Sequence, residues 1–258
     1  MRRMTMLLFV LLAVLWAADA TAGIVELKKD GFSISIPDDW REIPREVLDD
    51  YERGMKKADP KASVPHNDYG FSLKSAEDWF DTPCILLQIN KAGRIPESLL
   101  KQRFPPDAVQ EGLDDLEEFY DNVMKMDAND VKLLYDKEKK ILWISMKMNV
   151  KDFGETYGLS GMIMTEIGYI LATGTALAQE YPQYESVFRS VILSISPEPA
   201  LAYRPRWWDK LPPFLVSQGV TRILQQLTSL AFFLLVVAFI RRWRRKKRAD
   251  DIDLLGPL

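Results

Sequence analysis

The chain has 258 residues, of which 47% are hydrophobic, and its 34 basic and 37 acidic residues give a formal net charge of -3. This length supports one main hydrophobic core. Residues 23–221 carry 24 basic and 33 acidic side chains, a balance of 24 − 33 = -9. Because phosphate binding needs a positive footprint, this acidic body argues against nucleic acid as a partner.

Residues 1–22 have the pattern of a secretory signal peptide. Two arginines near the start precede the apolar run Leu7–Ala18, and Ala20-Thr21-Ala22 then offers the small-x-small pattern cleaved before Gly23. Ala18-Asp19-Ala20 is a second possible site. An uncleaved anchor is the alternative, but twelve helical residues span only about 18 Å of a layer about 30 Å thick.

The first half of the body alternates between strand and helix patterns. Apolar residues alternate with serines at 32–36, which predicts a half-buried strand ended by Pro37. Pro44 then begins a helix whose apolar face contains Val47, Leu48, Tyr51 and Met55. We expect further strands at 69–73 and 85–89, and a long helix over 107–126.

The second half predicts two hairpins and a closing helix. One hairpin joins 132–135 to 141–150 around the turn DKEKK, and the other spans 157–175 and turns near 166–168. In the last helix, Pro182 lies in the first turn. Its expected core face contains Tyr184, Val187, Phe188, Val191 and Ile195. We therefore expect the folded domain to cover residues 23–196.

Residues 197–222 form a proline-rich linker, with prolines at 197, 199, 205, 212 and 213. The next 18 residues, 223–240, carry no charge and are about 27 Å long as a helix, which predicts a single transmembrane span. A buried core helix or a surface amphipathic helix is the alternative. Interfacial aromatics and a basic cluster flank the run, and we expect these residues at the membrane interface: Trp207, Trp208, Trp243, Arg241, Arg242, Arg244 and Arg245.

Two rules give the same membrane orientation. Basic residues stay on the cytoplasmic side, and the tail 241–258 carries 7 − 3 = +4. A cleaved signal peptide leaves the new N-terminus outside. The chain contains no Asn-x-Ser/Thr acceptor, which favours a bacterial envelope. We predict a single-pass protein of the bacterial inner membrane with a periplasmic domain and a cytoplasmic tail.

Hairpins with long helices before and after them predict an α+β fold in which helices flank an antiparallel sheet. The stretch FSISIPDDW at 32–40 resembles the opening of the PsbP-like α-β-α sandwich family, and YESVFRSVILSIS at 184–196 is similar to its closing helix. The resemblance covers about residues 24–196 and implies a scaffold used for binding and assembly. Metal or histidine sites of some family members are not carried over, because the chain has only His66.

The sequence contains no catalytic, cofactor or metal motif. Its only histidine, His66, lacks a GxSxG or similar partner and is interpreted as a surface histidine. One histidine and one cysteine exclude the common zinc sites, and no phosphate-binding glycine motif occurs. Cys84, in the context PCILLQI, is interpreted as a buried strand residue.

An acidic stripe is the sharpest polar pattern. On the expected helix from 107, five carboxylates follow helical spacing on one side: Asp107, Glu111, Asp114, Glu118 and Asp121. They could dock a basic partner or weakly bind a cation, or they could be the solvated side of an amphipathic helix. Trp79 and Phe80 leave a similar choice between an exposed binding tip and packing onto the core.

These patterns predict a membrane-tethered, non-catalytic module that binds or assembles with another envelope protein or an amphiphilic ligand. A carboxylate-based hydrolytic enzyme is the first alternative, and it would need two acidic residues that converge in a pocket. The second alternative is an accessory subunit of a membrane complex. Its span would pair with other helices through Gln225, Gln226, Thr228 and Ser229.

Overall fold

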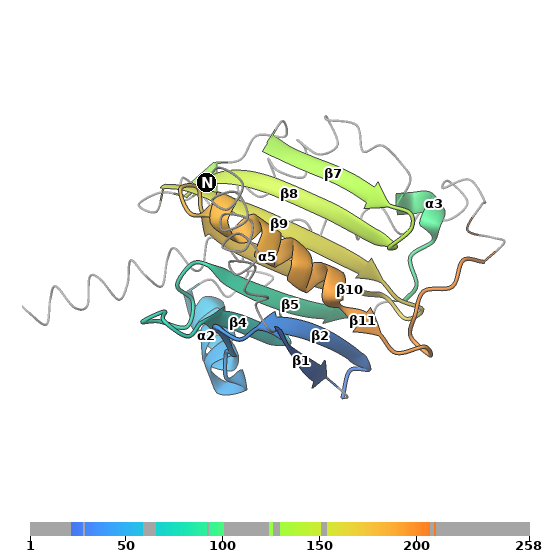
Figure 1. The fold of residues 1–258 in the computed structure, drawn as a ribbon, viewed down its shortest axis with the longest axis horizontal. Helices are drawn as coiled ribbons and strands as arrows, with labels where there is room; N and C mark the ends of the chain where they lie inside the picture. Colours follow the sequence, from blue (N-terminus) through green and yellow to red (C-terminus); the bar gives the residue numbers. More distant parts are fainter. Residues whose placement is uncertain are drawn as a thin grey trace, which may run out of the picture.

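The computed structural model describes residues 22–27, 29–58, 66–91, 93–100, 124–125, 130–150, 154–206 and 209. Two antiparallel sheets and three helices form this part of the protein (Figure 1). The fold is therefore α+β with helices on an antiparallel sheet, as predicted.

The smaller sheet joins the two ends of the domain. It has the order β1-β2-β11, with β1 at Ala22–Leu27, β2 at Phe32–Pro37 and β11 at Ser196–Pro197. In β2 the apolar residues point inward, since Ile34 is fully buried and Phe32 is 3% exposed. The strand β1 was not predicted; it begins at Ala22, the last residue of the predicted signal peptide, and pairs Gly23 with Ile36.

The larger sheet has the order β3-β4-β5-β10-β9-β8-β6, and β7 also pairs with β8. It contains the two hairpins that the sequence predicted, one formed by β7 and β8 and the other by β9 and β10. Its strands are β3 (Trp40–Glu42), β4 (Tyr69–Leu73), β5 (Cys84–Asn90), β6 (Met124–Lys125), β7 (Val131–Asp136), β8 (Ile141–Val150), β9 (Gly154–Met164) and β10 (Tyr169–Leu177).

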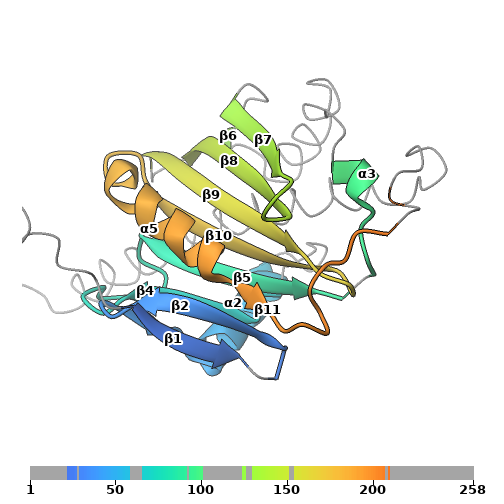
Figure 2. The same cartoon turned by 45° about the vertical axis from the view of Figure 1, so that its right-hand side comes forward.

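The helices are α2 (Arg45–Ala58), the short α3 (Glu97–Leu100) and α5 (Tyr181–Ser194). Helix α5 lies across β9 and β10 and reaches β2 (Figures 1 and 2). It sits close because Gly161 and Gly174 face it: a Cβ at Gly161 would collide with Ile192, and one at Gly174 would collide with the Phe188 ring. The two glycines thus form the seat of α5 on the sheet.

The predicted core faces of the helices are confirmed. Phe188 and Val191 of α5 are buried, and Ile195 is 7% exposed just after the helix ends. Leu48 and Tyr51 of α2 are buried as well. Cys84 is a fully buried strand residue whose thiol lies 3.2 Å from the Thr175 hydroxyl, as its sequence context indicated.

The predicted end of one helix is wrong. The long helix expected over 107–126 cannot extend to its predicted end, because Met124 and Lys125 form β6 and pair with Val150 and Asn149 of β8. Residues 107–123 lie outside the described part. None of the helices that the structure describes is long and apolar enough to cross a membrane, and the predicted span 223–240 lies outside these residues.

Candidate functional site

Five connections gather at one end of the two sheets, which we call the exit end because the described chain stops there, at Asp209. Their described residues are 29–31, 91, 93–95, 137–140, 165–168, 196–206 and 209. Backbone hydrogen bonds join them: Met164 donates to Lys140 over 3.2 Å, Glu198 donates to Gly31 over 2.8 Å, and Glu166 donates to Leu201 over 2.9 Å. The exit end is thus one continuous surface.

Arg94 holds the C-terminal segment to this surface. Its two terminal nitrogens each donate to one oxygen of Asp209 over 2.5 Å, and one of them also donates to the Arg204 carbonyl over 2.8 Å. The guanidinium lies 4.2 Å from the centre of the Tyr203 ring. The side chains of Arg94 and Asp209 are only 10% and 2% exposed. This buried two-pronged pair has the geometry of a strong charge-assisted contact.

Glu166, at the β9–β10 turn, completes the Arg94 cluster. It accepts hydrogen bonds from the Arg204 amide over 2.8 Å and from Arg94 Nε over 3.3 Å, and it pairs with Arg206. Burial alone would raise the pKa values of Glu166 and Asp209, but hydrogen bonds from these arginines and from backbone N–H groups outweigh it and hold both pKa values below their usual range. Both carboxylates are therefore charged at neutral pH.

The segment after Ser196 consequently remains part of the folded domain. Beyond β11, Thr165 pairs with Ala202, and the Tyr203 hydroxyl donates to the Ile95 carbonyl over 3.0 Å. The sequence placed the end of the domain near Ser196 and a spacer over 197–222. The contacts show that the proline-rich chain stays on the domain at least to Asp209 before it leaves the described part.

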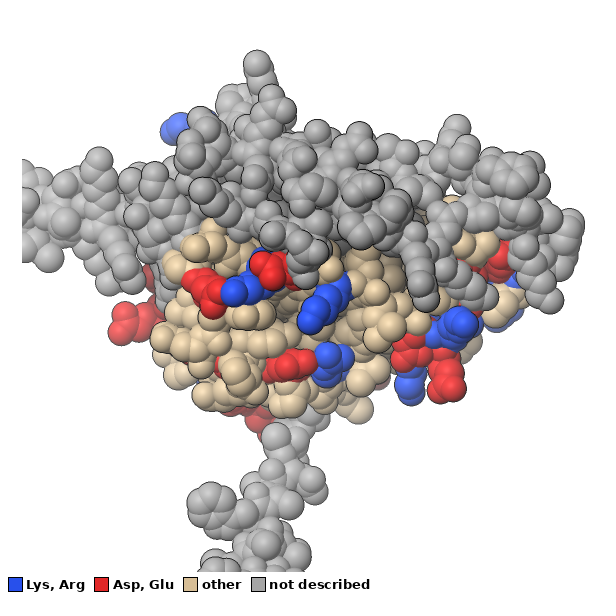
Figure 3. Space-filling view, turned by 90° about the horizontal axis from the view of Figure 1, so that it is seen from above, with Lys and Arg blue, Asp and Glu red and all other residues tan. Residues whose placement is uncertain are grey.

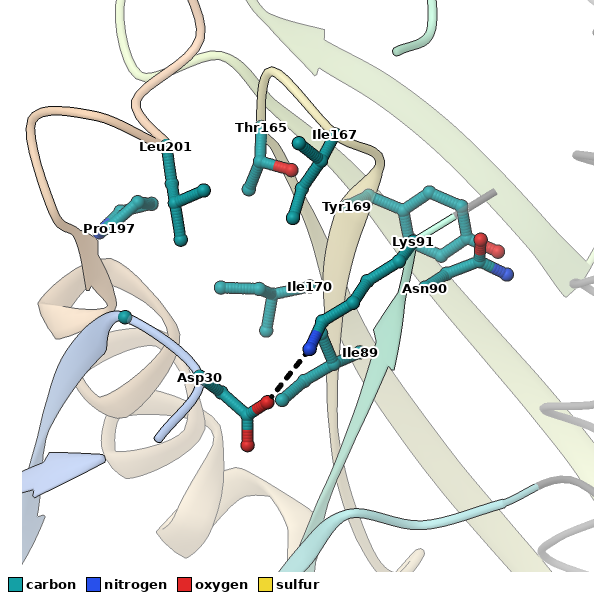
Figure 4. A pocket seen from close by; sticks show the side chains of 11 residues that line it. Asp30, Ile89, Asn90, Lys91, Thr165, Ile167, Tyr169, Ile170, Pro197 and Leu201 are labelled. Atoms are coloured by element: carbon teal, nitrogen blue, oxygen red, sulfur yellow. Dashed lines mark hydrogen bonds and ion pairs between the residues drawn. The ribbon is translucent and has the colours of Figure 1, made fainter. Parts of the chain in front are cut away.

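A small hollow opens beside the Arg94 cluster (Figure 4). Ile89, Ile170 and Leu201 contribute its apolar wall, and Lys91 pairs with Asp30 over 3.0 Å at its rim. The Tyr69 hydroxyl also donates to Asp30 over 2.8 Å. The volume of about 10 Å³ has room for about one water molecule, so this hollow does not hold a substrate-sized ligand.

The nearest arrangement to an acid–base site surrounds His66. Its Nδ1 lies 3.0 Å from Glu52 on α2, its Nε2 lies 3.5 Å from Asp68, and Arg45 reaches the ring over 3.3 Å. Burial raises the pKa of Asp68, although the Ile89 amide donates to its carboxylate. His66 is 57% exposed, which agrees with its interpretation as a surface histidine. The carboxylates of Glu52 and Asp68 thus both contact the imidazole ring of His66.

The residues predicted as sites are not placed by the structure. The acidic stripe, Asp107, Glu111, Asp114, Glu118 and Asp121, lies outside the described residues, as do Trp207, Trp208, Arg241, Arg242, Trp243, Arg244 and Arg245. Phe80 and Trp79 pack onto the domain and do not form an exposed binding tip. Phe80 is 6% exposed and its ring lies 4.6 Å from that of Tyr51 at a tilt of 34°, while half-buried Trp79 lies 4.1 Å from the Arg41 guanidinium.

Within the described ranges, no three His, Cys, Asp or Glu side chains are grouped so that they could hold a metal ion. Among the described residues, acidic and basic side chains form surface pairs such as Glu185–Arg189 and Glu155–Lys147. Figure 3 shows Lys or Arg side chains beside Asp or Glu side chains on the part of that face that is not grey.

Sequence reasoning missed the Arg94 cluster for a physical reason. Arg94 and Asp209 are 115 residues apart, and neither belongs to a periodic or motif pattern. Only the fold brings them together. The one available signal is weak: Glu166 was recognised as a turn residue, and turns carry much of the polar surface of a domain.

No protein-family model matches the sequence, and no curated protein matches it. Among solved structures, the chain is similar to cyanobacterial PsbP from Synechocystis, with a TM-score of 0.44 and 13% identity over 70% of this chain and 95% of that one. It is also similar to LpqN of Mycobacterium tuberculosis, described as involved in cell envelope biogenesis, with a TM-score of 0.35 and 15% identity over 69% and 91% of the chains. A Bacteroides thetaiotaomicron protein gives a TM-score of 0.35 and 13% identity over 65% and 45%. The resemblance to PsbP read from the sequence is thus confirmed as a weak structural similarity.

Proposed function

We propose that the protein is a membrane-tethered, extracytoplasmic binding or assembly module without catalytic activity. Its domain would be held at the periplasmic face of a bacterial inner membrane by the predicted span 223–240, with the basic tail 241–258 in the cytoplasm. The ligand would be another envelope protein or an amphiphilic molecule. This proposal joins the membrane signals of the sequence to a domain whose C-terminal segment is docked.

The observation that carries the proposal is the Arg94 cluster. The cluster docks the chain around residues 204–209 onto the domain, and in a tethered protein this contact would set the point from which the tether leaves. Between Asp209 and Ile223 there are 222 − 209 = 13 residues. Fully extended, they reach about 45 Å, which is the greatest distance between Asp209 and the predicted span.

Anchoring and topology can be tested directly on the full chain. We expect the protein to remain in the membrane after a carbonate wash, and a C-terminal alkaline phosphatase fusion to be inactive, because the tail is cytoplasmic. A fusion active in the periplasm would contradict the orientation. Solubility of the purified chain without detergent would contradict the anchor itself.

The binding role is tested by purification in mild detergent. We expect one partner to co-purify in a fixed ratio and to be lost when the detergent is made harsh. A partner retained through substitutions at Gln225 and Gln226 would favour docking by the domain, and one lost with them would favour the accessory-subunit alternative.

One arrangement of side chains supports the hydrolase alternative. The pKa of Asp68 is raised by burial, and Asp68 and Glu52 contact the same His66 ring. Hydrolysis of an envelope substrate that disappears in an Asp68→Asn variant would replace our proposal. A variant that keeps its fold and its partner would support the binding role.

A further inference from the structure

The exit end turns its basic side chains outward. Among the described residues of the five connections, six basic side chains are exposed, against the two acidic side chains of Glu138 and Glu198. The six are Lys29, Lys91, Lys137, Lys139, Arg204 and Arg206. The balance of exposed charges over these connections is thus 6 − 2 = +4, in a body whose overall charge is negative.

The acidic partners at this end are turned inward. The side chains of Asp30, Glu166 and Asp209 are 11%, 13% and 2% exposed. Two of the bases that they pair with, Lys91 and Arg206, are 55% and 44% exposed. At long range, the charges of the buried acids cancel much of the field of the exposed bases. The surface should therefore attract an anion that touches the bases, and should not steer one from a distance.

The opposite end of the sheets has the reverse character, and we call it the far end. It contains the β2–β3 turn and the starts of β7 and β9, and hydrogen bonds join Lys74 to Asp39 and Ala178 to Glu155 there. Among the residues that the structure describes there, the exposed charges are one basic residue, Lys74, against five acidic ones: Asp38, Asp39, Glu77, Asp130 and Glu155. The two ends therefore differ in sign along the strand direction.

An exposed apolar side chain lies among the bases of the exit end. Ile167, at the tip of the β9–β10 turn, is 39% exposed, next to Glu166 of the Arg94 cluster. Its carbonyl is fixed by the Gly93 amide over 3.0 Å. An apolar tip surrounded by Lys and Arg is the arrangement by which proteins rest on anionic bilayers, since the tip enters the interface while the cations meet phosphates.

We propose that the exit end is a contact surface for the anionic phospholipid headgroups of the membrane that holds the protein. Its exposed bases, among them Lys137, Lys139 and Arg204, contact lipid phosphates, and Ile167 enters the interface. The inference rests on the proposed function, because the anchor brings this end to the bilayer. The acidic far end is then directed away from the lipid, where it is free to meet a partner.

The test places a polarity-sensitive fluorophore at Ile167→Cys in the full-length protein reconstituted in vesicles. Leu134→Cys is the matched control, because Leu134 is 68% exposed on β7 and lies outside the five connections of the exit end. The unsubstituted chain is the blank, since Cys84 is fully buried. We expect a blue shift and quenching by spin-labelled headgroup lipids at position 167 in phosphatidylglycerol-containing vesicles. Neither should occur at position 134.

Charge dependence separates headgroup contact from simple proximity. In vesicles of phosphatidylcholine alone, the signal at position 167 should fall toward that at position 134. Lys137→Gln with Lys139→Gln should weaken the response to phosphatidylglycerol, while Lys132→Gln on β7 should leave it unchanged.

Equal signals at positions 167 and 134 in a protein that resists carbonate washing would overturn this inference and leave the anchor standing. A signal at 167 that ignores phosphatidylglycerol would overturn the role of the bases. Release of the chain by carbonate would instead overturn the proposed function, on which the inference depends.

Discussion

The seat of α5 and the exit end are held together by different forces. At the seat, Phe188 is fully buried against Gly174 and its ring also meets Trp40 edge-on at 6.3 Å, so the contact is apolar packing. At the exit end, Arg94 is held by two carboxylates and a tyrosine ring. Packing changes little with pH or salt, whereas a charge cluster depends on the ionisation of its members.

The seat of α5 determines the stability of the domain, whereas the Arg94 cluster determines the position of its C-terminal segment. Burial of aromatic and aliphatic area at the seat fixes the fold, because each large side chain contributes about 1.5–3 kcal/mol on burial. The Arg94 cluster fixes where the chain leaves the domain, and desolvation offsets much of its attraction. Substitutions at the seat of α5 should therefore unfold the domain, and substitutions in the Arg94 cluster should release the C-terminal segment.

The largest effect is expected at the seat of α5. Phe188→Ala removes a ring that is 0% exposed and leaves a cavity, so the free energy of unfolding should fall by about 3–5 kcal/mol. Leu193→Ala on the same helix is the control, because Leu193 is 48% exposed and its loss should cost less than about 0.5 kcal/mol. Thermal and urea unfolding in mild detergent would measure both. Similar losses for the two variants would contradict the packing of α5.

This seat is the part of the molecule that the sequence predicts best. The periodic pattern of Val187, Phe188 and Val191 identifies a helix face from local spacing alone. The hairpins were also predictable, since alternation and turn residues are local signals. The strand β1 was not predicted because its residues, AGIVEL, adjoin the predicted signal peptide 1–22 and have no alternation of their own.

The exit end could not be predicted in the same way. Its charged residues come from separate connections, and single Arg, Glu and Asp residues between elements look like ordinary surface positions. Proline content favoured a spacer from residue 197, because it excludes helix. Proline content does not exclude docking by side chains, and Arg94 supplies that docking.

The next largest effect should follow from acid. The pKa values of Asp209 and Glu166 are lowered in the folded protein, so their contribution is present above the unfolded pKa values of about 4 and is lost as the pH falls through the folded ones. Hydrogen exchange of residues 198–206, corrected for intrinsic rates, should show protection at about pH 6 that is lost at a pH below both folded pKa values. The β9–β10 hairpin is the internal control. Equal protection at both values would mean that the charges do not hold the segment.

Removing one carboxylate should have a smaller effect than protonating both. Asp209→Ala leaves Arg94, which is 10% exposed, without its two-pronged partner, and should weaken docking of the segment by about 1.5–3 kcal/mol. Glu198→Ala is the control, because Glu198 is exposed. Limited proteolysis between Ser196 and Asp209 would report docking separately from unfolding. Faster cleavage in both variants, or in neither, would remove the special role of Asp209.

The smallest effect is expected at His66, which tests whether burial or the number of contacts makes the exit end strong. His66, like Arg94, contacts two carboxylates, here those of Glu52 and Asp68, and it also contacts Arg45, yet it is 57% exposed. Water and salt screen such pairs, so His66→Gln should change the free energy of unfolding by less than about 0.5 kcal/mol. Thermal unfolding near neutral pH would measure it beside Asp209→Ala. If both substitutions lower the free energy of unfolding equally, the number of contacts and not burial determines the strength of both clusters. The Arg94 cluster would then be no stronger than an exposed cluster.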